Sequence, residues 1–274
     1  MNSKSSCRHA GDLYRSTERE HLQRDFLYGT AFSGIAITIA TWALRGSWNL
    51  LLGWPALSFA LVGSAYLLGD VRIFGKRGNG SRHWLATIFL FPYLAFAHFV
   101  WWAQISLSSE PATSAVNDRL VISRRLRSAE LPHGIAQICD LTCEFVDPVR
   151  LRSRIKYVCH PILDAGASDA SELAVLAKSL LPPVDGKLLI HCANGHGRTG
   201  MFAAVWLVAH GFVTSVDDAV KLIREARPGV SLRRRQYQLA MKAEVALQNI
   251  VEQSHATEPA DGPASNRNSS APAR

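Results

Sequence analysis

Residues 191–200, which read HCANGHGRTG, combine the residue types that attack a phosphate ester. Cys192 follows an apolar stretch, Lys187–Ile190, and a glycine-containing loop separates it from Arg198 and a helical stretch beginning near Thr199. Only the thiolate form of a cysteine is a strong nucleophile. A loop that leads into a helix N-terminus stabilises that anion with unpaired N–H groups and with the positive end of the helix dipole. The order strand, cysteine, loop, arginine, helix therefore predicts attack on a phosphate monoester.

The loop between Cys192 and Arg198 is suited to hold a tetrahedral oxyanion. Its two glycines allow the backbone to curl so that successive N–H groups point inward. Arg198 offers a planar pair of donors to two phosphate oxygens. The hydroxyl of Thr199 can donate to the Cys192 sulfur and help it to leave. The predicted substrate-binding positions of the loop are Ala193, Asn194, Gly195, His196 and Gly197.

These residues resemble the signature of the cysteine-based protein tyrosine and dual-specificity phosphatases, His-Cys-x-x-Gly-x-x-Arg-Ser/Thr-Gly. Every fixed position of that signature is matched between His191 and Gly200. The resemblance implies an α/β domain with a central, mostly parallel sheet flanked by helices, and hydrolysis through a cysteinyl-phosphate intermediate without metal or other cofactor. It implies that Cys192 is the nucleophile and that Arg198 binds phosphate and stabilises the transition state. It also implies that His191 orients the loop.

The mechanism needs a general acid, which this family places upstream of the nucleophile. Residues 157–164 predict a strand that runs into a loop with Asp164 at its end. From there Asp164 can protonate the leaving oxygen and later activate water. Asp169 is the alternative, although it precedes a helical stretch at Glu172–Leu180, where aspartate commonly caps a helix. Resemblance to the family's acid loop favours Asp164, and the choice between the two stays open.

Other segments place the motif in a domain of about half the chain. Arg119–Ser123 and Gly134–Thr142 resemble the first two strands of a dual-specificity phosphatase, and Ala226–Val230 resembles its Arg-Pro-Gly segment. Gln236 matches a glutamine that positions the hydrolytic water in some relatives, and an exposed helix position is the equal alternative. The resemblance spans residues 114–250. Tyrosine-specific members are usually much larger, so this length favours the dual-specificity or lipid-phosphatase side.

Two other activities share parts of the pattern. A Cys-x5-Arg loop also occurs in arsenate reductases and rhodanese-like sulfurtransferases, and a domain of this kind can be an inactive phosphate-binding module. Gly195, the Thr199-Gly200 pair and the upstream acid favour a phosphatase over the first alternative. Intact Cys192 and Arg198 argue against the second.

The first part of the chain contains long stretches without charge. Between residues 26 and 69 the only fixed charge is Arg45, and Trp84–Leu107 has none. A helix needs roughly 20 apolar residues to cross a bilayer core. Tryptophans lie mostly near the ends of these stretches, as expected at a membrane interface; they are Trp42, Trp48, Trp54, Trp84, Trp101 and Trp102. We predict a polar N-terminal arm at 1–25 and a membrane region at 26–109 with about three transmembrane helices.

The distribution of positive charge and the cysteine content predict opposite membrane topologies for that region. Positive charge marks the cytoplasmic side of short loops. The basic residues near the membrane are Lys4, Arg8, Arg15, Arg19 and Arg24 in the arm, and Arg72, Lys76, Arg77 and Arg82 between the second and third stretches. Three crossings would place the phosphatase domain on the side opposite to both groups. A reactive thiol accompanied by Cys139, Cys143 and Cys159 instead favours a reducing compartment, and so a cytoplasmic domain.

Composition limits the partners further. The chain has 274 residues and a net charge of +8, with basic clusters at 119–127, 150–156 and 233–235. Anionic head groups attract such clusters beside a bilayer, whereas no nucleic-acid recognition motif accompanies them. Five cysteines without paired metal-type spacing predict no zinc site. The tail at 254–274 is rich in Ala, Pro, Ser and Asn and is predicted to be disordered.

Two substrate classes fit these features, phosphoproteins (on Tyr and Ser/Thr) and a phospholipid head group. The loop lacks the pair of lysines that suits highly phosphorylated inositol lipids in some relatives, and a protonated His196 adds one charge at most. A singly phosphorylated head group, such as that of phosphatidylglycerophosphate, therefore fits better. Attachment to a bilayer would also raise the effective concentration of a membrane-resident substrate.

Overall fold

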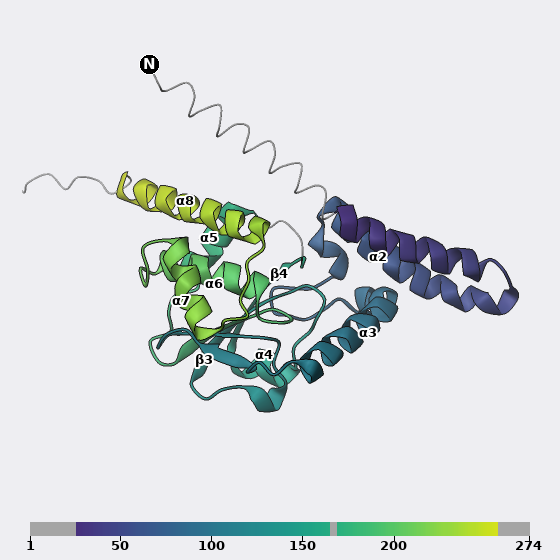
Figure 1. The fold of residues 1–274 in the computed structure, drawn as a ribbon, viewed down its shortest axis with the longest axis horizontal. Helices are drawn as coiled ribbons and strands as arrows, with labels where there is room; N and C mark the ends of the chain where they lie inside the picture. Colours follow the sequence, from purple (N-terminus) through teal and green to yellow (C-terminus); the bar gives the residue numbers. More distant parts are fainter. Residues whose placement is uncertain (1–25, 165–168, 257–274) are drawn as a thin grey trace, which may run out of the picture.

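The computed structural model describes residues 26–164 and 169–256 (Figure 1). The predicted arm at 1–25 and most of the predicted tail lie outside these residues. The elements after a first helix at Phe26–Ala43 are η1 (Ser47–Leu52), α2 (Gly53–Leu68), η2 (Val71–Phe74), α3 (Trp84–Leu107), β1 (Thr113–Ala115), β2 (Leu120–Ser123), η3 (Ser128–Glu130), β3 (Ile135–Thr142), α4 (Val149–Arg154), β4 (Lys156–Ile162), α5 (Ala170–Ser179), β5 (Lys187–His191), α6 (Gly197–Ala209), α7 (Val216–Ala226) and α8 (Arg234–Ala256).

The described residues form a five-stranded sheet in the order β1-β2-β5-β3-β4. The pairs β2/β5, β5/β3 and β3/β4 are parallel, and only the edge strand β1 is antiparallel to its neighbour. β5 therefore lies at the centre, and the loops after β5, β3 and β4 meet at one edge of the sheet. Sites in parallel sheets form at this carboxyl edge.

Alternating side chains pack both faces of the sheet. Leu188 and Ile190 of β5 join the large core under α5, α6, α7 and α8, whereas Leu189 between them joins a smaller cluster with Leu151 of α4. Ten of the thirteen residues of α6 are buried, because α6 lies between the sheet and the other helices. The predicted fold class, a mostly parallel sheet flanked by helices, is confirmed.

Two details of the predicted domain differ in the structure. The strands predicted to be first and second are β2 and β3, because the short edge strand β1 precedes them. Three residues carry too little pattern to be recognised as a strand. At the other end, α8 runs to Ala256, beyond the predicted end at Ile250 and into the predicted tail.

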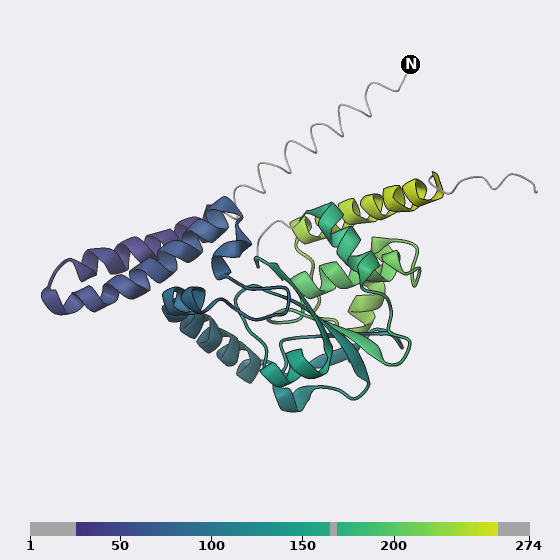
Figure 2. The same cartoon turned by 180° about the vertical axis from the view of Figure 1, so that it is seen from behind.

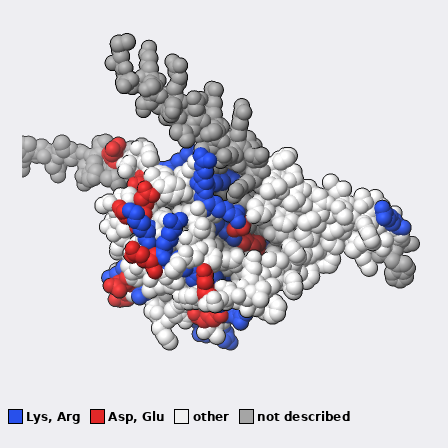
Figure 3. Space-filling model, in the orientation of Figure 1, with Lys and Arg blue, Asp and Glu red and all other residues white. Residues whose placement is uncertain are grey.

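Three helices in the described part of the chain are long and apolar enough to cross a membrane, namely Phe26–Ala43, the helix within Asn49–Leu68, and Trp84–Leu107. The first helix and α2 form a hairpin that points away from the α/β domain, whereas α3 runs obliquely to the hairpin along that domain (Figures 1 and 2). Figure 3 shows the hairpin as a surface almost free of charge, in contrast with the domain.

A shared apolar cluster joins these helices to the domain. It contains Phe59 and Val62 of α2, Leu90 and Tyr93 of α3, and the domain residues Cys143 and Leu163, which follow β3 and β4. The backbone N–H of Tyr93 also donates to Ser58 Oγ at 3.2 Å. The helices are therefore packed against the carboxyl edge of the sheet, where the predicted site lies.

Candidate active site

The loop that carries Cys192 begins where the central strand ends. β5 carries Cys192 to the carboxyl edge of the sheet, and α6 begins at Gly197, so the loop surrounds a helix N-terminus. Cys192 is 4% exposed, and its sulfur accepts a hydrogen bond from the N–H of Gly195 at 3.3 Å. Gly195 has a φ of +74°, and a Cβ there would lie 2.6 Å from backbone atoms of Ser123 and Arg124. This turn therefore requires glycine.

Arg198 is buried and is held by a carboxylate outside the motif. Its two terminal nitrogens lie 2.6 and 3.0 Å from the two carboxylate oxygens of Glu144. Burial disfavours the charge on each of these two side chains. For Glu144, the attraction of Arg198 is stronger than the effect of burial and lowers the pKa of the carboxylate to about 2. Likewise, Glu144 overcomes the burial of Arg198 and keeps the pKa of the guanidinium above its ordinary value. The Nε of Arg198 has no hydrogen-bond partner among the described residues, which leaves one buried donor at the loop.

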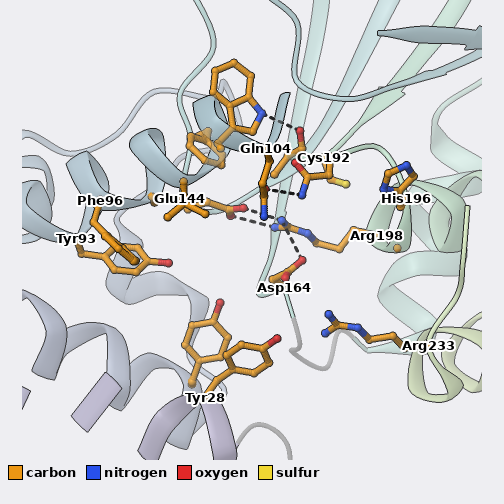
Figure 4. A pocket seen from close by; sticks show the side chains of 18 of the residues that line it. Tyr28, Tyr93, Phe96, Gln104, Glu144, Asp164, Cys192, His196, Arg198 and Arg233 are labelled. Carbon is orange, nitrogen blue, oxygen red and sulfur yellow. Dashed lines mark hydrogen bonds and ion pairs between the residues drawn. The ribbon is translucent and has the colours of Figure 1, made fainter. Parts of the chain in front are cut away.

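The two candidate acids lie in different places. Asp164 lines the cavity over the loop, and its Oδ1 is 3.3 Å from Arg198 Nη2 (Figure 4). Its side chain is 53% exposed. Asp169 caps α5, since its Oδ1 accepts from the N–H of Ser171 at 2.7 Å and of Glu172 at 3.1 Å. The fold thus brings Asp164 to the phosphate loop and uses Asp169 at a helix end.

His191 belongs to a buried group of charges behind the loop. Its Nε2 lies 3.0 Å from Asp147 Oδ2 and 3.9 Å from Asp140 Oδ1, and its Nδ1 is 3.4 Å from the Cys192 carbonyl oxygen. Burial opposes a charge on the imidazole, but the two carboxylates outweigh it and raise the pKa of His191 to about 9. A protonated His191 therefore places positive charge immediately before Cys192 in the chain.

Lys76 reaches the same group from the loop at residues 69–83, which connects α2 and α3. Its ammonium pairs with Asp140 and donates to the carbonyl and the hydroxyl of Thr142 at 2.6 and 2.8 Å. Both side chains of the Lys76–Asp140 pair are fully buried. Potential metal-ligand atoms of Asp140, Asp147 and His191 lie within 4.8 Å of one another. Lys76 already supplies positive charge here, and ion pairs with Lys76 and His191 compensate the carboxylates of Asp140 and Asp147.

Glu110 fixes the outer side of the loop. Its Oε2 lies 2.7 Å from His196 Nε2 and 3.1 Å from a terminal nitrogen of Arg227. Arg227 also donates to the Pro111 carbonyl at 2.8 Å. The Arg-Pro-Gly segment therefore holds the chain that leaves α3, and through Glu110 it holds the loop histidine.

α3 also contacts the phosphate loop directly. The indole N–H of Trp101 donates to the carbonyl of Ala193 at 3.1 Å, and the amide of Asn194 donates to Gln104 Oε1 at 3.0 Å. Trp101 is buried, and Arg125 lies over its ring with 5.1 Å between the guanidinium carbon and the centroid. Trp101 thus supports the loop and does not belong to an exposed aromatic belt.

A cavity of about 350 Å³ lies over the loop, with walls from both halves of the chain (Figure 4). Cys192, Arg198, Asp164 and Gln236 line it on the domain side. Aromatic side chains of all three apolar helices line it opposite; they are Tyr28, Phe32, Tyr66, Tyr93, Phe96 and Trp101. The phosphate loop therefore faces a largely aromatic wall.

The surroundings of Thr199 and Gln236 bear on the roles predicted for these two residues. The Thr199 hydroxyl is buried and has no hydrogen-bond partner within the described ranges, so the predicted bond to the Cys192 sulfur is not formed here. Gln236 lies in the cavity and against the loop, since a Cβ at Gly197 would meet its amide at 2.6 Å. Its Oε1 accepts from the N–H of Arg233 at 3.1 Å.

Sequence reasoning missed Glu144, Glu110, Lys76 and Trp101. Glu144 had a recognisable signal, because it follows β3 directly and the carboxyl ends of parallel strands converge. The other three come from the region predicted to be a membrane anchor or from its junction with the domain. Only the packing of that region against the domain brings them to the site.

Comparison with known proteins agrees with this geometry. Residues 125–257 match the family described as "PTP-SAK: Swiss Army Knife protein, DSP-PTPase phosphatase domain". Comparison with curated proteins finds no match.

Solved structures similar to the domain include Tk-PTP in its active form, with 23% identity, a TM-score of 0.44, and coverage of 49% of this chain and 97% of that one. Human DUSP28 has 20% identity, a TM-score of 0.45, and coverage of 51% and 97%. PTPMT1 in complex with PI(5)P has 13% identity, a TM-score of 0.44, and coverage of 51% and 99%.

The family match covers the strands and helices that carry the HCANGHGRTG loop, and the fold has the sheet and flanking helices that the loop's signature implies. The domain at residues 125–257 therefore belongs to the dual-specificity branch of the cysteine-based protein tyrosine phosphatase superfamily.

Proposed function

We propose that this protein is a membrane-anchored phosphatase that hydrolyses the phosphate monoester of a lipid head group through a cysteinyl-phosphate intermediate. One observation carries the proposal: the cavity has the phosphate loop on one side and side chains of three apolar helices on the other. The loop supports the reaction type, and the helical wall supports the substrate class.

In the first step, the Cys192 thiolate attacks phosphorus in line with the leaving oxygen. The S–P bond forms as the P–O bond to the alcohol breaks, and Asp164 gives its proton to the departing oxygen. Arg198 and the loop N–H groups hold the phosphoryl oxygens, where charge develops in the transition state. Glu144 keeps the guanidinium in place with its Nε unpartnered within the described ranges.

In the second step, water attacks phosphorus and the S–P bond breaks. Asp164, now a carboxylate, takes the proton from water, and inorganic phosphate leaves while Cys192 returns to the thiolate. Gln236 borders Gly197 inside the cavity and can orient this water. Protonated His191 stabilises the thiolate that is released in this step.

The wall of the cavity favours a lipid over a phosphoprotein. Tyr28, Tyr66 and Tyr93 present phenol rings that combine an apolar body with a polar tip, which suits the boundary between a head group and acyl chains. α3 contacts the loop directly, so a folded phosphoprotein would have to pass around this helix to reach it. Arg233, which is exposed, lines the same cavity and can attract an anionic head group.

The full-length protein in liposomes tests this proposal. Phosphate release should be measured from a lipid phosphate monoester in the same bilayer and from phosphotyrosine and phosphoserine peptides, with Cys192→Ser as the control. We expect kcat/KM for the lipid to exceed that for either peptide by at least tenfold. The reverse preference would overturn the lipid assignment and leave the phosphatase standing. Turnover of every substrate at the Cys192→Ser level would instead support an inactive phosphate-binding module.

A matched pair on α3 tests the role of the aromatic wall. Phe96 lines the cavity, whereas Phe99 on the same helix is 64% exposed and does not line it. Phe96→Ala should lower kcat/KM for the lipid more than for p-nitrophenyl phosphate, and Phe99→Ala should show no such difference. Equal effects of Phe96→Ala on both substrates would contradict recognition of the lipid by this wall.

A further inference from the structure

Both ends of α3 are attached to the same folded domain. Before α3, the 69–83 loop pairs with the edge strand β4, where the carbonyl of Gly78 accepts from the N–H of Cys159 at 2.9 Å. Arg82 donates to the carbonyl of Cys143 at 2.8 Å, and Lys76 inserts beside Asp140.

At the other end of α3, Trp101 and Gln104 bind the phosphate loop through Ala193 and Asn194. A helix that crosses a bilayer separates its ends by a hydrocarbon core of about 30 Å. The fully buried Lys76–Asp140 pair and the phosphate loop belong to one domain, which cannot lie on both sides of such a core. The contacts at the two ends of α3 are therefore incompatible with a full crossing by this helix.

α3 instead has two different faces. Leu90, Tyr93, Leu94 and Trp101 are buried against the hairpin and the domain. Other large apolar residues of the helix are exposed; they include Ile88, Phe89, Phe99 and Trp102. This exposed apolar face gains free energy when the acyl chains of a bilayer remove it from water, while the opposite face of α3 stays packed against the hairpin and the domain.

The hairpin has the features of a true membrane insertion. Its two apolar helices contain 18 and 20 residues, which is close to the length needed to cross. Figures 1 and 2 show the hairpin pointing away from the domain. Figure 3 shows positive charge at its far end, and Arg45 is the only fixed charge between residues 26 and 69. The two ends of the hairpin, near Phe26 and Leu68, lie on the side of the domain.

We infer that the chain crosses the bilayer twice, through the hairpin alone, and that α3 lies along the membrane surface as the lipid-facing wall of the active site. This inference deepens the membrane anchoring of the proposed function, and it replaces the predicted three crossings. The N-terminal arm, the 69–83 loop and the phosphatase domain then share one side.

Two crossings also remove the conflict between charge and cysteine chemistry. The basic residues of the arm and the 69–83 loop mark their side as cytoplasmic, and the phosphatase domain now lies on that side. The four cysteines described in the domain are free, as expected in a reducing compartment. The active site therefore opens at the cytoplasmic surface of the membrane.

Cysteine labelling in sealed membranes tests this topology. The background is the Cys7→Ser variant, whose remaining cysteines are buried. Single cysteines are introduced into it as Arg45→Cys at the hairpin tip, Arg77→Cys in the 69–83 loop and Glu225→Cys on α7. A membrane-impermeant maleimide is applied to intact cells and to inverted vesicles, and labelling in detergent shows that each variant is made and reactive. Cys7→Ser alone gives the background.

We expect Arg77→Cys and Glu225→Cys to be labelled in inverted vesicles only, and Arg45→Cys from outside intact cells only. Labelling of Arg77→Cys and Glu225→Cys from opposite sides would show three crossings and overturn the inference. Labelling of all three positions from one side would show that the hairpin does not cross, and would overturn it equally. Because labelling does not require turnover, failure of the topology and failure of the phosphatase proposal are distinguishable.

Discussion

The pairing of Arg198 with Glu144 requires desolvation of both charges and fixes the orientation of the guanidinium. Removing a guanidinium and a carboxylate from water costs several kcal/mol per ion, and the bidentate contact offsets that cost. In return, the guanidinium is held in one orientation before any substrate arrives. A preorganised donor needs no rearrangement as charge develops on the phosphoryl oxygens. Glu144 is therefore a positioning residue for the reaction that we propose.

Asp164 and Asp169 offer a matched pair for testing the general acid. Asp164→Asn should lower kcat by about 10²- to 10⁴-fold for substrates with alkyl leaving groups, which need a proton, and much less for p-nitrophenyl phosphate. Asp169→Asn should retain kcat, because Asp169 serves as the N-cap of α5 and asparagine caps equally well. Steady-state kinetics on both substrates would decide. An Asp169→Asn variant with the larger loss of kcat would contradict the assignment.

At the level of single residues, the sequence predicts what lies within one short motif. Cys192, Gly195 and Arg198 follow from their spacing, because a strand, a loop and a helix start suffice to position them. Lys76 and Glu110 could not be predicted, since their partners Asp140 and His196 are 64 and 86 positions away in the chain. Contacts at such separations follow from the packed fold and leave no local pattern.

Among the elements, the 69–83 loop joins the apolar helices to the domain that carries Cys192. It covers the edge of β4 and places Lys76 in the same buried network as His191, which directly precedes Cys192 in the chain. An edge strand covered by a loop is also protected from pairing with other chains.

A double-mutant cycle tests this connection. Lys76→Met leaves Asp140 buried without its main cation and should destabilise the protein by about 3–5 kcal/mol. Asp140→Asn in the same chain should recover part of that loss, because the uncompensated charge is removed. Arg77→Met, at an exposed neighbouring position, is the control. Denaturant unfolding of the solubilised full-length protein gives the free energies. A Lys76→Met change as mild as Arg77→Met would rule out the buried pair.

The elements were predictable to different degrees. The strands at 120–123, 135–142, 156–162 and 187–191 follow from apolar runs that end in loops. The sequence predicts an apolar helix at the position of α3 and, from its length and composition, a membrane crossing. The attachment of both ends of α3 to one domain, on which the inferred two-crossing topology rests, leaves no signal in composition.

On the scale of the whole molecule, the three apolar helices and the α/β domain enclose one cavity. The α/β domain supplies the phosphate loop and the apolar helices supply the aromatic wall. Neither part encloses the cavity without the other. This arrangement explains why a chain with a complete phosphatase domain also packs three apolar helices against its carboxyl edge.

The stability of the whole protein should depend on pH through His191. Its pKa is about 9 in the folded protein and about 6.5 when unfolded, so its contribution is fully present below pH 6.5 and is lost as the pH rises through 9. That loss is at most about 3 kcal/mol. Thermal unfolding of the solubilised protein should show Tm falling between pH 7 and 10. In His191→Gln the fall over this window should be smaller, and an unchanged slope would contradict the assignment.

Trapping of the covalent intermediate tests the central claim most directly. Full-length protein in liposomes is mixed with a lipid phosphate monoester carrying ³²P, quenched within the first turnover, and separated by denaturing electrophoresis. We predict label on the wild-type chain at Cys192, none on Cys192→Ser, and intact labelling of Cys159→Ser as the matched control. Release of phosphate without label on Cys192, or release by Cys192→Ser at the wild-type rate, would contradict the account.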